Sequence, residues 1–220
     1  TVPTPLRDGA PDLAYVEDAV IELGRTMRPG SCVVLESTTY PGTTHDLVVP
    51  LLERESGLTA GVDFQVGFSP ERIDPGNPTW GLHNTPKIVA GIDAASRDRI
   101  AAFYGSIVER VVPVSDPKVA EMSKLLENTY RHVNIALINE LAIFAYELEI
   151  DIWEVIDAAA TKPFGFQRFV PGPGVGGHCL PIDPSYLSWQ VQRQLGHPFR
   201  FVELANDINA FSEKHGCDRL

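Results

Sequence analysis

The stretch between Pro117 and Glu149 contains no glycine and no further proline, and no other feature constrains the fold as strongly. Asp116 can cap a helix, and Pro117 can occupy its first turn. We therefore expect one helix from residue 117 to about residue 149, far longer than the usual three turns. Its apolar residues cover most of the circumference, which predicts a buried helix that packs in part against another subunit.

The residues before this helix alternate between strand-like and helix-like patterns. Apolar runs predict strands at 31–35, 64–68, 87–90 and 111–114. Helical spacing and turn signals predict helices at 14–27, from the turn at 36–43 to about residue 55, and at 94–106. This rhythm favours a parallel sheet with crossover helices, in which the run at 31–35 is a strand buried on both faces.

The residues after Asp151 change character. They predict a helix, a Gly/Pro-rich loop over 163–177 and a further helix from about Pro184. The fold class is therefore α/β, with a sheet followed by an all-helical region. No GxGxxG follows an opening strand, and residues 1–5 have the pattern of a strand end that passes into a loop. We interpret the chain as a fragment of a longer protein.

Composition and charge argue against several classes of protein. The formal charge of −11 and the pI near 4.9 disfavour a nucleic-acid surface, which needs clustered Lys and Arg. No apolar run approaches the roughly 20 residues of a membrane span, and the polar start lacks the regions of a signal peptide. We therefore expect a cytoplasmic protein that binds neither nucleic acid nor membrane.

The segment PGPGVGGHCLPIDP at 171–184 is the most unusual part of the sequence. Its glycines let the backbone approach a ligand closely and adopt positive φ. Cys179 lies just before a helix start, where the helix dipole lowers the pKa of a thiol, so it is a candidate nucleophile. The alternative is a buried structural cysteine. The three cysteines (Cys32, Cys179 and Cys217) lack CxxC spacing, which favours neither a disulfide framework nor a zinc ribbon.

Two neighbours of Cys179 also have two interpretations each. Asp183, directly before Pro184, fits an ordinary helix N-cap, and this is compatible with a carboxylate that orients water. His178 could serve as a base for the thiol or, with Cys179, as a metal ligand. Adjacent residues seldom direct both side chains at one centre, and no second ligand pair has zinc spacing, so we expect no metal.

Lys124, Asn128 and Arg131 fall at i, i+4 and i+7 of the predicted long helix, which places them on one face. A cation and an amide donor one turn apart can stabilise an oxyanion. The alternative is an ordinary solvated stripe with Glu121 or Glu127 as its partner.

Two polar loops follow predicted strands, at the edge where open α/β sheets bind ligands. The first, at 36–42, contains the hydroxyls of Ser37, Thr38 and Thr39, each of which could equally be a turn or cap residue. The second, at 69–77, contains Glu71, which could equally be a solvated loop carboxylate. Two such loops on one edge favour a ligand-binding cleft.

Taken together, these motifs resemble those of the UDP-glucose/GDP-mannose dehydrogenase family, in family order and over nearly the whole chain. The matching segments are VPTP at 2–5, ESTT at 36–39, SPER at 69–72, EMSKLLENTY at 121–130, NEL at 139–141 and GGHCLPIDP at 176–184. The GGxCLPxD and KLxxNTY elements are specific. Segments 171–189 and 126–135 are most similar to the branch that oxidises UDP-N-acetylhexosamines, especially UDP-N-acetylglucosamine.

The resemblance implies a partial Rossmann-like parallel sheet at 1–115, as the C-terminal part of an NAD-binding domain. It implies a central helical domain at 116–220 that forms a homodimer through the long helix. The family's glycine-rich fingerprint and UDP-binding domain have no counterpart in the chain. The implied activity is the oxidation of the C6 hydroxyl of a UDP-sugar to a uronic acid for polysaccharide biosynthesis, with two molecules of NAD.

The resemblance also assigns roles to individual residues. Cys179 would be the covalent nucleophile, and Lys124 and Asn128 would stabilise the oxyanion. Glu71 and Asp183 would handle protons and water, with Thr38 placing the water and touching the nicotinamide side. The expected substrate contacts are Arg72, Arg168, Gly176 and Gly177. The expected cofactor contacts are Thr4, Pro5, Ser37 and Thr38. Some members carry a second Glu four residues after Glu71, where this chain has Pro75.

Two other classes of protein fit parts of the sequence. A cysteine hydrolase or acyltransferase could use Cys179 and His178, although the sequence offers no convincing third member of a triad. A helical dimerisation module without activity would need only the long helix. The first predicts ester cleavage without NAD reduction, and the second predicts a dimer whose Gly-rich loop binds nothing.

Overall fold

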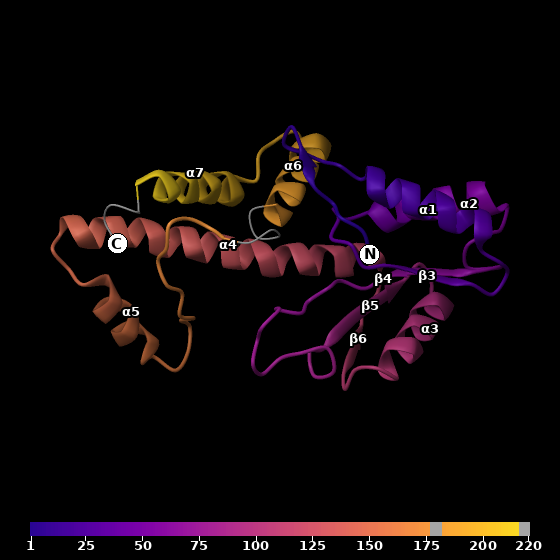
Figure 1. Cartoon of the computed structure of the whole chain (residues 1–220), viewed down its shortest axis with the longest axis horizontal. Coiled ribbons are helices and arrows are strands. Elements are labelled where there is room, and N and C mark those ends of the chain that lie inside the picture. The colour runs from indigo at the N-terminus through magenta and orange to yellow at the C-terminus, as the bar shows by residue number, and fades with distance from the viewer. Residues whose placement is uncertain (177–181, 216–220) are drawn as a thin grey trace. The chain divides into compact units, whose positions relative to one another are not determined.

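A computed structural model of the chain describes residues 1–176 and 182–215 (Figure 1). The chain divides into two compact units, Thr1–Leu125 and Leu126–Leu220. The division falls inside the long helix α4 (Pro117–Glu147), which confirms the helix predicted from the stretch without glycine. Glu149 ends it with a φ of 57°, and the N–H of Ile150 donates to the Ala145 carbonyl at 2.8 Å, as in a Schellman motif.

A four-stranded sheet with the order β3-β4-β5-β6 forms the centre of the first unit. Its strands are β3 (Cys32–Leu35), β4 (Gln65–Phe68), β5 (Lys87–Gly91) and β6 (Val111–Pro113). The predicted α/β fold is confirmed, but the sheet is mixed, because β4 and β5 pair antiparallel while the other two pairs are parallel. Segment 69–86, which connects β4 to β5, contains no crossover helix. β5 therefore begins at the edge of the sheet where β4 ends.

Two glycines make the antiparallel junction possible. Gly67 of β4 pairs with Gly91 of β5. A Cβ at Gly67 would collide with the carbonyl oxygen of Ala90, and a Cβ at Gly91 would collide with the backbone of Arg97. A larger residue at Gly67 would therefore separate β4 from β5. A larger residue at Gly91 would separate β5 from the helix at 94–105.

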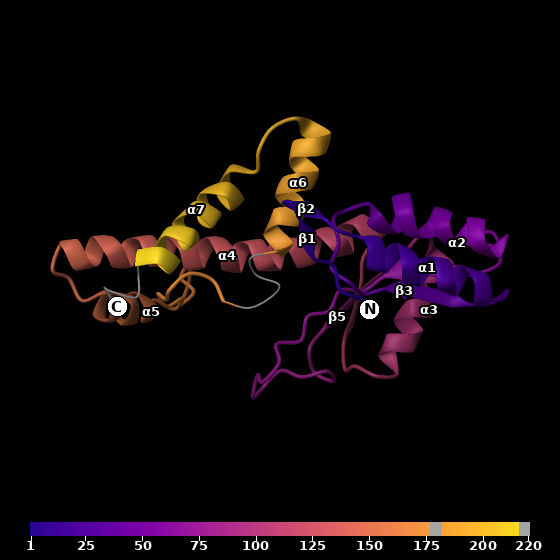
Figure 2. The ribbon, with the colours of Figure 1, turned by 45° about the horizontal axis from the view of Figure 1, so that its top comes forward.

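Helices cover both faces of this sheet. They are α1 (Ala14–Thr26), the π-helical turn η1 (Thr44–Val48) that continues into α2 (Val49–Ser56), and α3 (Ala94–Gly105). α1 and α2 lie on one face and α3 on the other (Figures 1 and 2). A short hairpin of β1 (Leu6–Arg7) and β2 (Ala10–Pro11) precedes α1.

Pro50 directly follows the π-helical turn, at the start of α2. Proline has no N–H, so the carbonyl of Asp46 cannot receive the usual i→i−4 hydrogen bond. The N–H of Val49 instead donates to the Thr44 carbonyl, five residues back. The wider turn lies next to the loop that carries Thr38.

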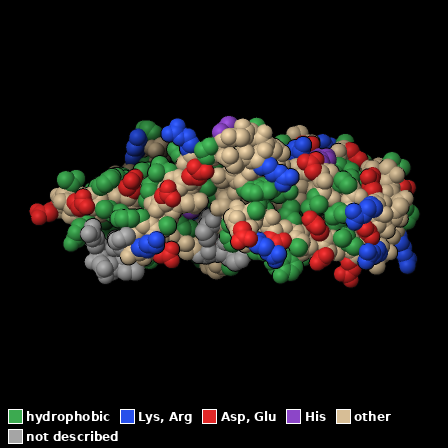
Figure 3. All heavy atoms as spheres, turned by 90° about the horizontal axis from the view of Figure 1, so that it is seen from above, with side chains coloured by type: hydrophobic (Ala, Val, Ile, Leu, Met, Phe, Trp, Pro, Cys, Tyr) green, Lys and Arg blue, Asp and Glu red, His purple; other side chains and the backbone are tan. Residues whose placement is uncertain are grey.

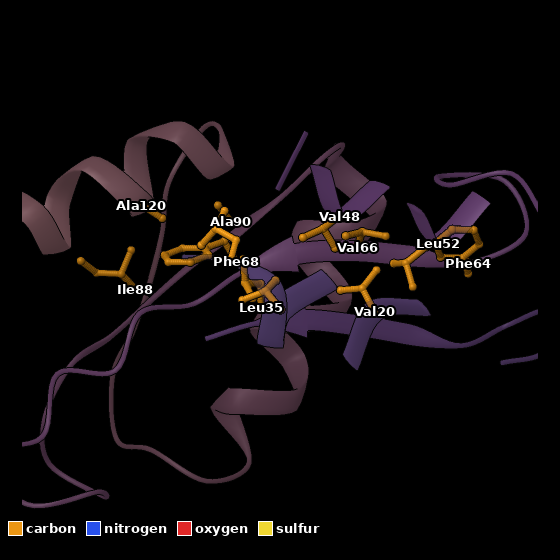
Figure 4. Close-up of a cluster of buried hydrophobic side chains, with 12 residues drawn as sticks. Val20, Leu35, Val48, Leu52, Phe64, Val66, Phe68, Ile88, Ala90 and Ala120 are labelled. Carbon is orange, nitrogen blue, oxygen red and sulfur yellow. The ribbon is translucent and has the colours of Figure 1, made fainter. Parts of the chain in front are cut away.

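The core of the first unit lies between the sheet and the helices α1 and α2 (Figure 4). Phe64, Val66 and Phe68 alternate along the chain, so they face the same side of the sheet, and all three are fully buried. Val20 of α1 and Leu52 of α2 pack into the same cluster. Burying a side chain of this size contributes about 1.5–3 kcal/mol, so this layer fixes the strand ends.

β3 differs from the prediction of a strand buried on both faces. Cys32 is exposed, Val33 and Val34 are half-buried, and only Leu35 is buried. β3 is an outer strand of this sheet and has one neighbour, whereas the inner strand β5 is buried at every position. The same apolar pattern therefore describes an edge strand here.

The second unit is helical, as predicted. Besides the larger part of α4 it contains α5 (Ile152–Ala160), α6 (Asp183–Leu195) and α7 (Arg200–His215). The Asp151 side chain caps α5 by accepting hydrogen bonds from two backbone N–H groups. Gly196, with a φ of 74°, ends α6 and separates it from α7, a helix that the sequence did not predict.

One face of α4 buries polar side chains, and another face exposes large apolar ones. Its buried face carries polar groups within about 40° of the helix circumference. They are Glu121, Asn128, His132 and Asn139. The opposite face carries large apolar side chains within about 60°, each at least 42% exposed. They are Leu126, Tyr130, Leu137, Leu141, Phe144 and Leu148. The single chain thus does not bury the whole helix, which corrects that part of the prediction.

No helix in the parts of the chain that the structure describes is long and apolar enough to cross a membrane. Figure 3 shows one face of the chain, on which charged side chains are scattered among apolar ones. The Lys and Arg side chains on that face lie among Asp and Glu side chains, which matches the acidic balance of the sequence.

Candidate active site

Asn128 of α4 and Asp183 of α6 form a buried pair in the second unit. The Asn128 Nδ2 atom donates to the Asp183 Oδ2 atom at 2.5 Å, and the residues are 7% and 4% exposed. Hydrogen bonds to an ionised carboxylate are shorter and stronger than neutral ones. The structure thus brings together two predicted site residues that lie 55 positions apart in the sequence.

Asp183 is the first residue of α6 but not its N-cap. The cap position belongs to Ile182, and no side-chain cap hydrogen bond forms there. The interpretation of Asp183 as a plain N-cap is therefore wrong. Its carboxylate instead lies in the first helical turn, where the helix dipole favours negative charge, and reaches α4.

Lys124 lies one turn before Asn128 on α4 and is half-buried, whereas Arg131, one turn further along, is exposed. Glu121, one of the two alternative partners for this stripe, binds elsewhere. The three residues therefore differ in burial although they share a face of the helix. Their predicted role in stabilising an oxyanion stays a prediction.

Glu121 is fully buried near the start of α4 and binds the beginning of η1, inside the first unit. Its Oε2 atom accepts the Gly42 N–H at 2.6 Å, and its Oε1 atom accepts the Thr44 N–H at 2.9 Å and hydroxyl at 2.7 Å. Burial raises the pKa of the Glu121 carboxyl, although these hydrogen bonds oppose the shift. Because the loop with Thr38 ends at Gly42, this carboxyl group fixes that end of the loop.

His132 occupies the same buried face of α4 and is 2% exposed. Its Nε2 atom lies 2.8 Å from the Asn206 Oδ1 atom of α7, and an oxygen only accepts, so Nε2 carries the proton. Burial lowers the pKa of His132, and the hydrogen bond to Asn206 opposes this shift. The ring therefore joins α7 to α4 as a neutral group.

The Gly-rich loop is described up to Gly176. Cys179, together with His178 and Gly177, lies outside the described residues, so the roles proposed for them stay predictions. Gly174 has a φ of 99°, a conformation that the glycine-rich pattern predicts. Gly176 is exposed, and a Cβ there would meet no atom within 4 Å.

Arg168 is exposed and pairs with Asp157 of α5. Its Nη2 and Nε atoms lie 2.9 and 3.2 Å from the Asp157 Oδ1 atom. An exposed ion pair of this kind contributes at most about 1 kcal/mol, so a phosphate group could displace it at little cost. The predicted contact of Arg168 with a ligand phosphate stays a prediction.

In the first unit, the buried Ser37 joins the loop after β3 to the N-terminal segment. Its hydroxyl accepts from the Val2 N–H and donates to the Val2 carbonyl, both at 2.8 Å. The segment with Thr4 and Pro5, two predicted cofactor contacts, is thereby attached to the predicted cofactor loop. The single hydroxyl proton of Ser37 is used in this contact, so Ser37 can only accept a further hydrogen bond.

Glu36, Lys87 and Tyr104 form a cluster at the same edge that the sequence did not predict. The Glu36 Oε1 atom accepts from the Lys87 Nζ atom at 2.9 Å and from the Tyr104 hydroxyl at 2.6 Å. The Lys87 ammonium group also lies 5.0 Å from the centre of the Tyr104 ring. It donates to the Pro70 carbonyl at 3.2 Å as well, so the cluster joins the loop after β3 to the loop after β4.

The cluster shifts the titration of its members. Burial alone would raise the pKa of the Glu36 carboxyl, but hydrogen bonds from Tyr104 and Lys87 lower it below its ordinary value. Burial and the Glu36 carboxylate raise the pKa of the Tyr104 hydroxyl. At neutral pH the cluster therefore contains a carboxylate and a neutral phenol.

Glu71 and Arg72 lie in the loop after β4. Glu71 is exposed, and its Oε1 atom accepts the N–H of Ile73 at 2.5 Å within the loop. The Arg72 Nη1 atom donates to the Pro86 carbonyl at 2.7 Å and so closes the base of the loop. Their predicted contacts with protons, water and substrate stay predictions.

The loop after β3 in the first unit offers hydroxyl groups to a nucleotide such as NAD. Thr38 is half-buried after β3, and the buried Thr39 hydroxyl has no hydrogen-bond partner among the described residues. Hydroxyls at the carboxyl edge of a sheet suit the polar groups of a nucleotide. A pyrophosphate needs a glycine-rich turn between an opening strand and a helix, and no GxGxxG stands in that place here.

Comparison with known proteins identifies the class of both units. Residues 1–108 match the NAD binding domain of the UDP-glucose/GDP-mannose dehydrogenase family, and residues 118–211 match the central domain of the same family. The chain belongs to the UDP-glucose/GDP-mannose dehydrogenase family.

Individual relatives match over most of this chain. Protein CapL of Staphylococcus aureus is 45% identical over 90% of this chain and 46% of its own length. A UDP-N-acetyl-D-glucosamine 6-dehydrogenase of Pseudomonas aeruginosa is 42% identical over 90% of this chain and 47% of its own length. The structure of a UDP-D-ManNAc dehydrogenase from Pyrococcus horikoshii has a TM-score of 0.91 at 37% identity, over 99% of this chain and 51% of that one. The chain thus spans about half the length of these relatives.

Proposed function

We propose that this chain is part of an NAD-dependent nucleotide-sugar 6-dehydrogenase that oxidises the C6 hydroxyl of a UDP-N-acetylhexosamine, with UDP-N-acetylglucosamine as the expected substrate. Matches to the family's NAD-binding and central domains support the class of enzyme. Relatives named as dehydrogenases of UDP-N-acetyl-D-glucosamine and UDP-N-acetyl-D-mannosamine support the class of sugar. The structural observation that carries the proposal is the buried hydrogen bond between Asn128 and Asp183.

The proposed reaction uses Cys179 as a covalent group. The C6 alcohol first loses a hydride and a proton and becomes an aldehyde, whose carbon is attacked by the Cys179 thiolate to form a carbon–sulfur bond. Loss of a second hydride turns the resulting thiohemiacetal into a thioester. Water cleaves the carbon–sulfur bond, which releases the carboxylic acid and returns the thiol. NAD, when bound, would accept one hydride in each of the two oxidations.

Asn128 and Lys124 stabilise the negative oxygen that forms when sulfur or water attacks the carbonyl carbon. The Asn128 Nδ2 atom carries two hydrogens, and the bond to Asp183 uses one of them. The second hydrogen is left for a substrate oxygen, and the carboxylate fixes the direction of the amide. Donors that are oriented before the reaction stabilise developing charge most effectively.

Asp183, Glu71 and Thr38 handle protons and water. Asp183 is anchored by Asn128, and its carboxylate would orient the water that cleaves the thioester. Glu71 and Thr38 lie in loops that the Glu36 cluster and Glu121 hold in place. Arg72, Arg168, Gly176 and Gly177 would contact the phosphates or the sugar of the substrate. Residues 1–115 would bind NAD, and residues 116–220 would supply the thiol. The reaction would take place in the cytoplasm.

The decisive experiment measures NADH formation by the full-length protein with a panel of UDP-sugars. We expect the absorbance of NADH to rise with UDP-N-acetylglucosamine and two NADH to form for each uronic acid. In Cys179→Ser, carboxylate formation should be lost while the UDP-sugar still binds, as measured by calorimetry. Unchanged turnover in that variant would refute the covalent role, and no NADH with any UDP-sugar would refute the enzyme class.

We also propose that two copies pair through the exposed apolar face of α4. Tyr130, Leu137 and Phe144 on this face are seven residues apart, and so are Leu141 and Leu148, a spacing that suits helix pairing. A twofold pair would bury the same face of both copies.

A further inference from the structure

Asn139 is a buried amide on α4 with both of its polar atoms engaged. It is 2% exposed and lies three turns after Asn128, on the same face of the helix. Its Oδ1 atom accepts the backbone N–H of Gly172 at 2.9 Å, and its Nδ2 atom donates to the Asn209 Oδ1 atom of α7 at 3.0 Å. One side chain thus joins α4, α7 and the Gly-rich loop at Gly172.

After Gly172 the loop also packs closely against α7, at Gly174. Gly174 donates its N–H to the Gly172 carbonyl at 2.8 Å, so the two glycines form one tight turn. A Cβ at Gly174 would lie 3.1 Å from the Asn209 carbonyl oxygen and 3.3 Å from the Glu213 Cβ atom. The path of the loop at 172–174 is therefore set by Asn139 on one side and by the backbone of α7 on the other.

An amide is needed at position 139 because the two contacts have opposite polarity. The Gly172 N–H requires an acceptor, and the Asn209 oxygen requires a donor. A leucine could fill the space but would leave the Gly172 N–H and the Asn209 oxygen without this partner. A side chain that only filled space in the core would not need this pair of groups.

We infer that Asn139 is a positioning residue for the catalytic loop, which it holds at Gly172, seven residues before Cys179 in the sequence. Its hydrogen bond fixes where the loop leaves the helical core, and so restricts the positions that the thiol can adopt. The inference rests on the proposed function only for its effect on turnover, since the loop contact stands independently of the reaction.

The test compares four variants of the full-length protein. Asn139→Ala removes both contacts, and Asn209→Ala removes only the partner that orients Asn139. Asn209→Asp keeps an acceptor for the Asn139 amide and is the conservative replacement. Asn134→Ala is the matched control, because Asn134 lies on the same helix and donates only to the Tyr130 carbonyl of its own turn.

Three readouts separate positioning from stability alone. Hydrogen exchange of the 171–176 segment reports the loop contact, and the pH profile of iodoacetamide labelling at residue 179, read by peptide mass spectrometry, reports the thiol. Turnover supplies kcat and KM. In Asn139→Ala we expect faster exchange, a displaced labelling profile, and a kcat about 10- to 100-fold lower, with the KM for NAD within about twofold. Asn209→Ala should show a smaller change in the same direction, and Asn209→Asp and Asn134→Ala should resemble the wild type.

Two results would overturn the inference. One is an Asn139→Ala protein whose exchange, labelling profile and kcat equal those of the wild type. The other is a protein that melts earlier but keeps the wild-type labelling profile and kcat, since that is the behaviour of a merely structural residue. If Asn139→Ala fails to fold, the Asn209→Ala and Asn209→Asp pair decides by the same readouts. If the wild type forms no NADH, the proposed function fails, whereas exchange and labelling still decide the role of Asn139.

Discussion

The amide of Asn128 donates to the carboxylate of Asp183 at 2.5 Å, and neither residue is more than 7% exposed. Removing one partner leaves the other buried and less well satisfied, which costs about 1–3 kcal/mol. We therefore expect Asn128→Ala and Asp183→Ala each to lower the unfolding free energy by this amount. The double variant should lose less than the sum, with a coupling of at least about 0.5 kcal/mol in denaturant titrations. Additive losses would show that the pair does not interact, and Asn134→Ala serves as the control for loss of an amide from α4.

Tyr104→Phe tests the Glu36 cluster, because it removes one hydroxyl that donates to the carboxylate. We expect a loss of about 1 kcal/mol at neutral pH. The pKa of Glu36 in the folded state lies below its ordinary value of 4.5, so its stabilisation is present above that pH and is lost as the pH falls through the folded value. The difference between wild type and variant should therefore shrink below about pH 4.5 in acid denaturation. A difference that is constant with pH would contradict the assignment, and Tyr15→Phe, at an exposed tyrosine of α1, is the control.

The sequence predicts the secondary structure well where glycine and proline mark the ends of elements. The single helix α4 follows from the stretch between Pro117 and Glu149, and the strand runs are found within about two residues. The direction of β5 could not be predicted, because the loop at 69–86 contains no periodic pattern that shows whether the chain crosses the sheet. Periodicity finds elements, but their pairing depends on contacts between distant segments.

The candidate site was only partly predictable for a related reason. Glu36 binds Lys87 and Tyr104, which are 51 and 68 residues away, and nothing local in the sequence marks these partners. Similarly, α4 has a face with polar residues and a face with large apolar residues. Polarity alone would predict that the apolar face is buried, but in this chain the polar residues are buried and the large apolar ones are exposed. Its polar groups are buried because each meets a partner from another segment: Gly42 and Thr44, Asp183, Asn206, and Gly172 with Asn209. Helical spacing and the position before Pro184 made Asn128 and Asp183 candidates with alternatives left open, and the resemblance to a family assigned their roles.

Glu121→Gln should change how the stability of the first unit depends on pH. Burial raises the pKa of Glu121 above its ordinary value of 4.5, so the folded protein holds a proton that the unfolded chain has already released. The contribution of this group to the unfolding free energy is therefore fully present below pH 4.5. It is lost as the pH rises through the pKa of Glu121 in the folded protein. Glutamine does not titrate, so the stability of the wild type relative to the variant should fall as the pH rises above about 4.5. A gap that widens over this range in denaturant titrations would contradict the shift.

Leu137→Glu combined with Leu141→Glu should separate the proposed dimer. These leucines are 50% and 42% exposed in the single chain, so the charges cost the monomer little but would be buried in the pair. We expect sedimentation to show a wild-type dimer and a monomeric double variant with an unchanged helical signal in circular dichroism. Arg131→Glu adds a charge change on the exposed surface of α4 outside the apolar face and should remain dimeric. A wild-type monomer at micromolar concentration, or a dimeric double variant, would exclude this face as the interface.

His132 should make the second unit sensitive to acid. Burial lowers its pKa below the ordinary value of 6.5, so below that pH the unfolded chain binds a proton that the folded protein does not. The unfolding free energy is therefore retained above pH 6.5 and declines as the pH falls through the folded value. His132→Gln keeps a donor for Asn206 but cannot be protonated, so it should remove part of this decline as the pH falls below 6.5. The exposed His197→Gln is the control and should keep the wild-type slope in denaturant titrations at matched ionic strength. If His132→Gln kept the full decline as well, another group in the fold would be responsible for the loss of stability in acid.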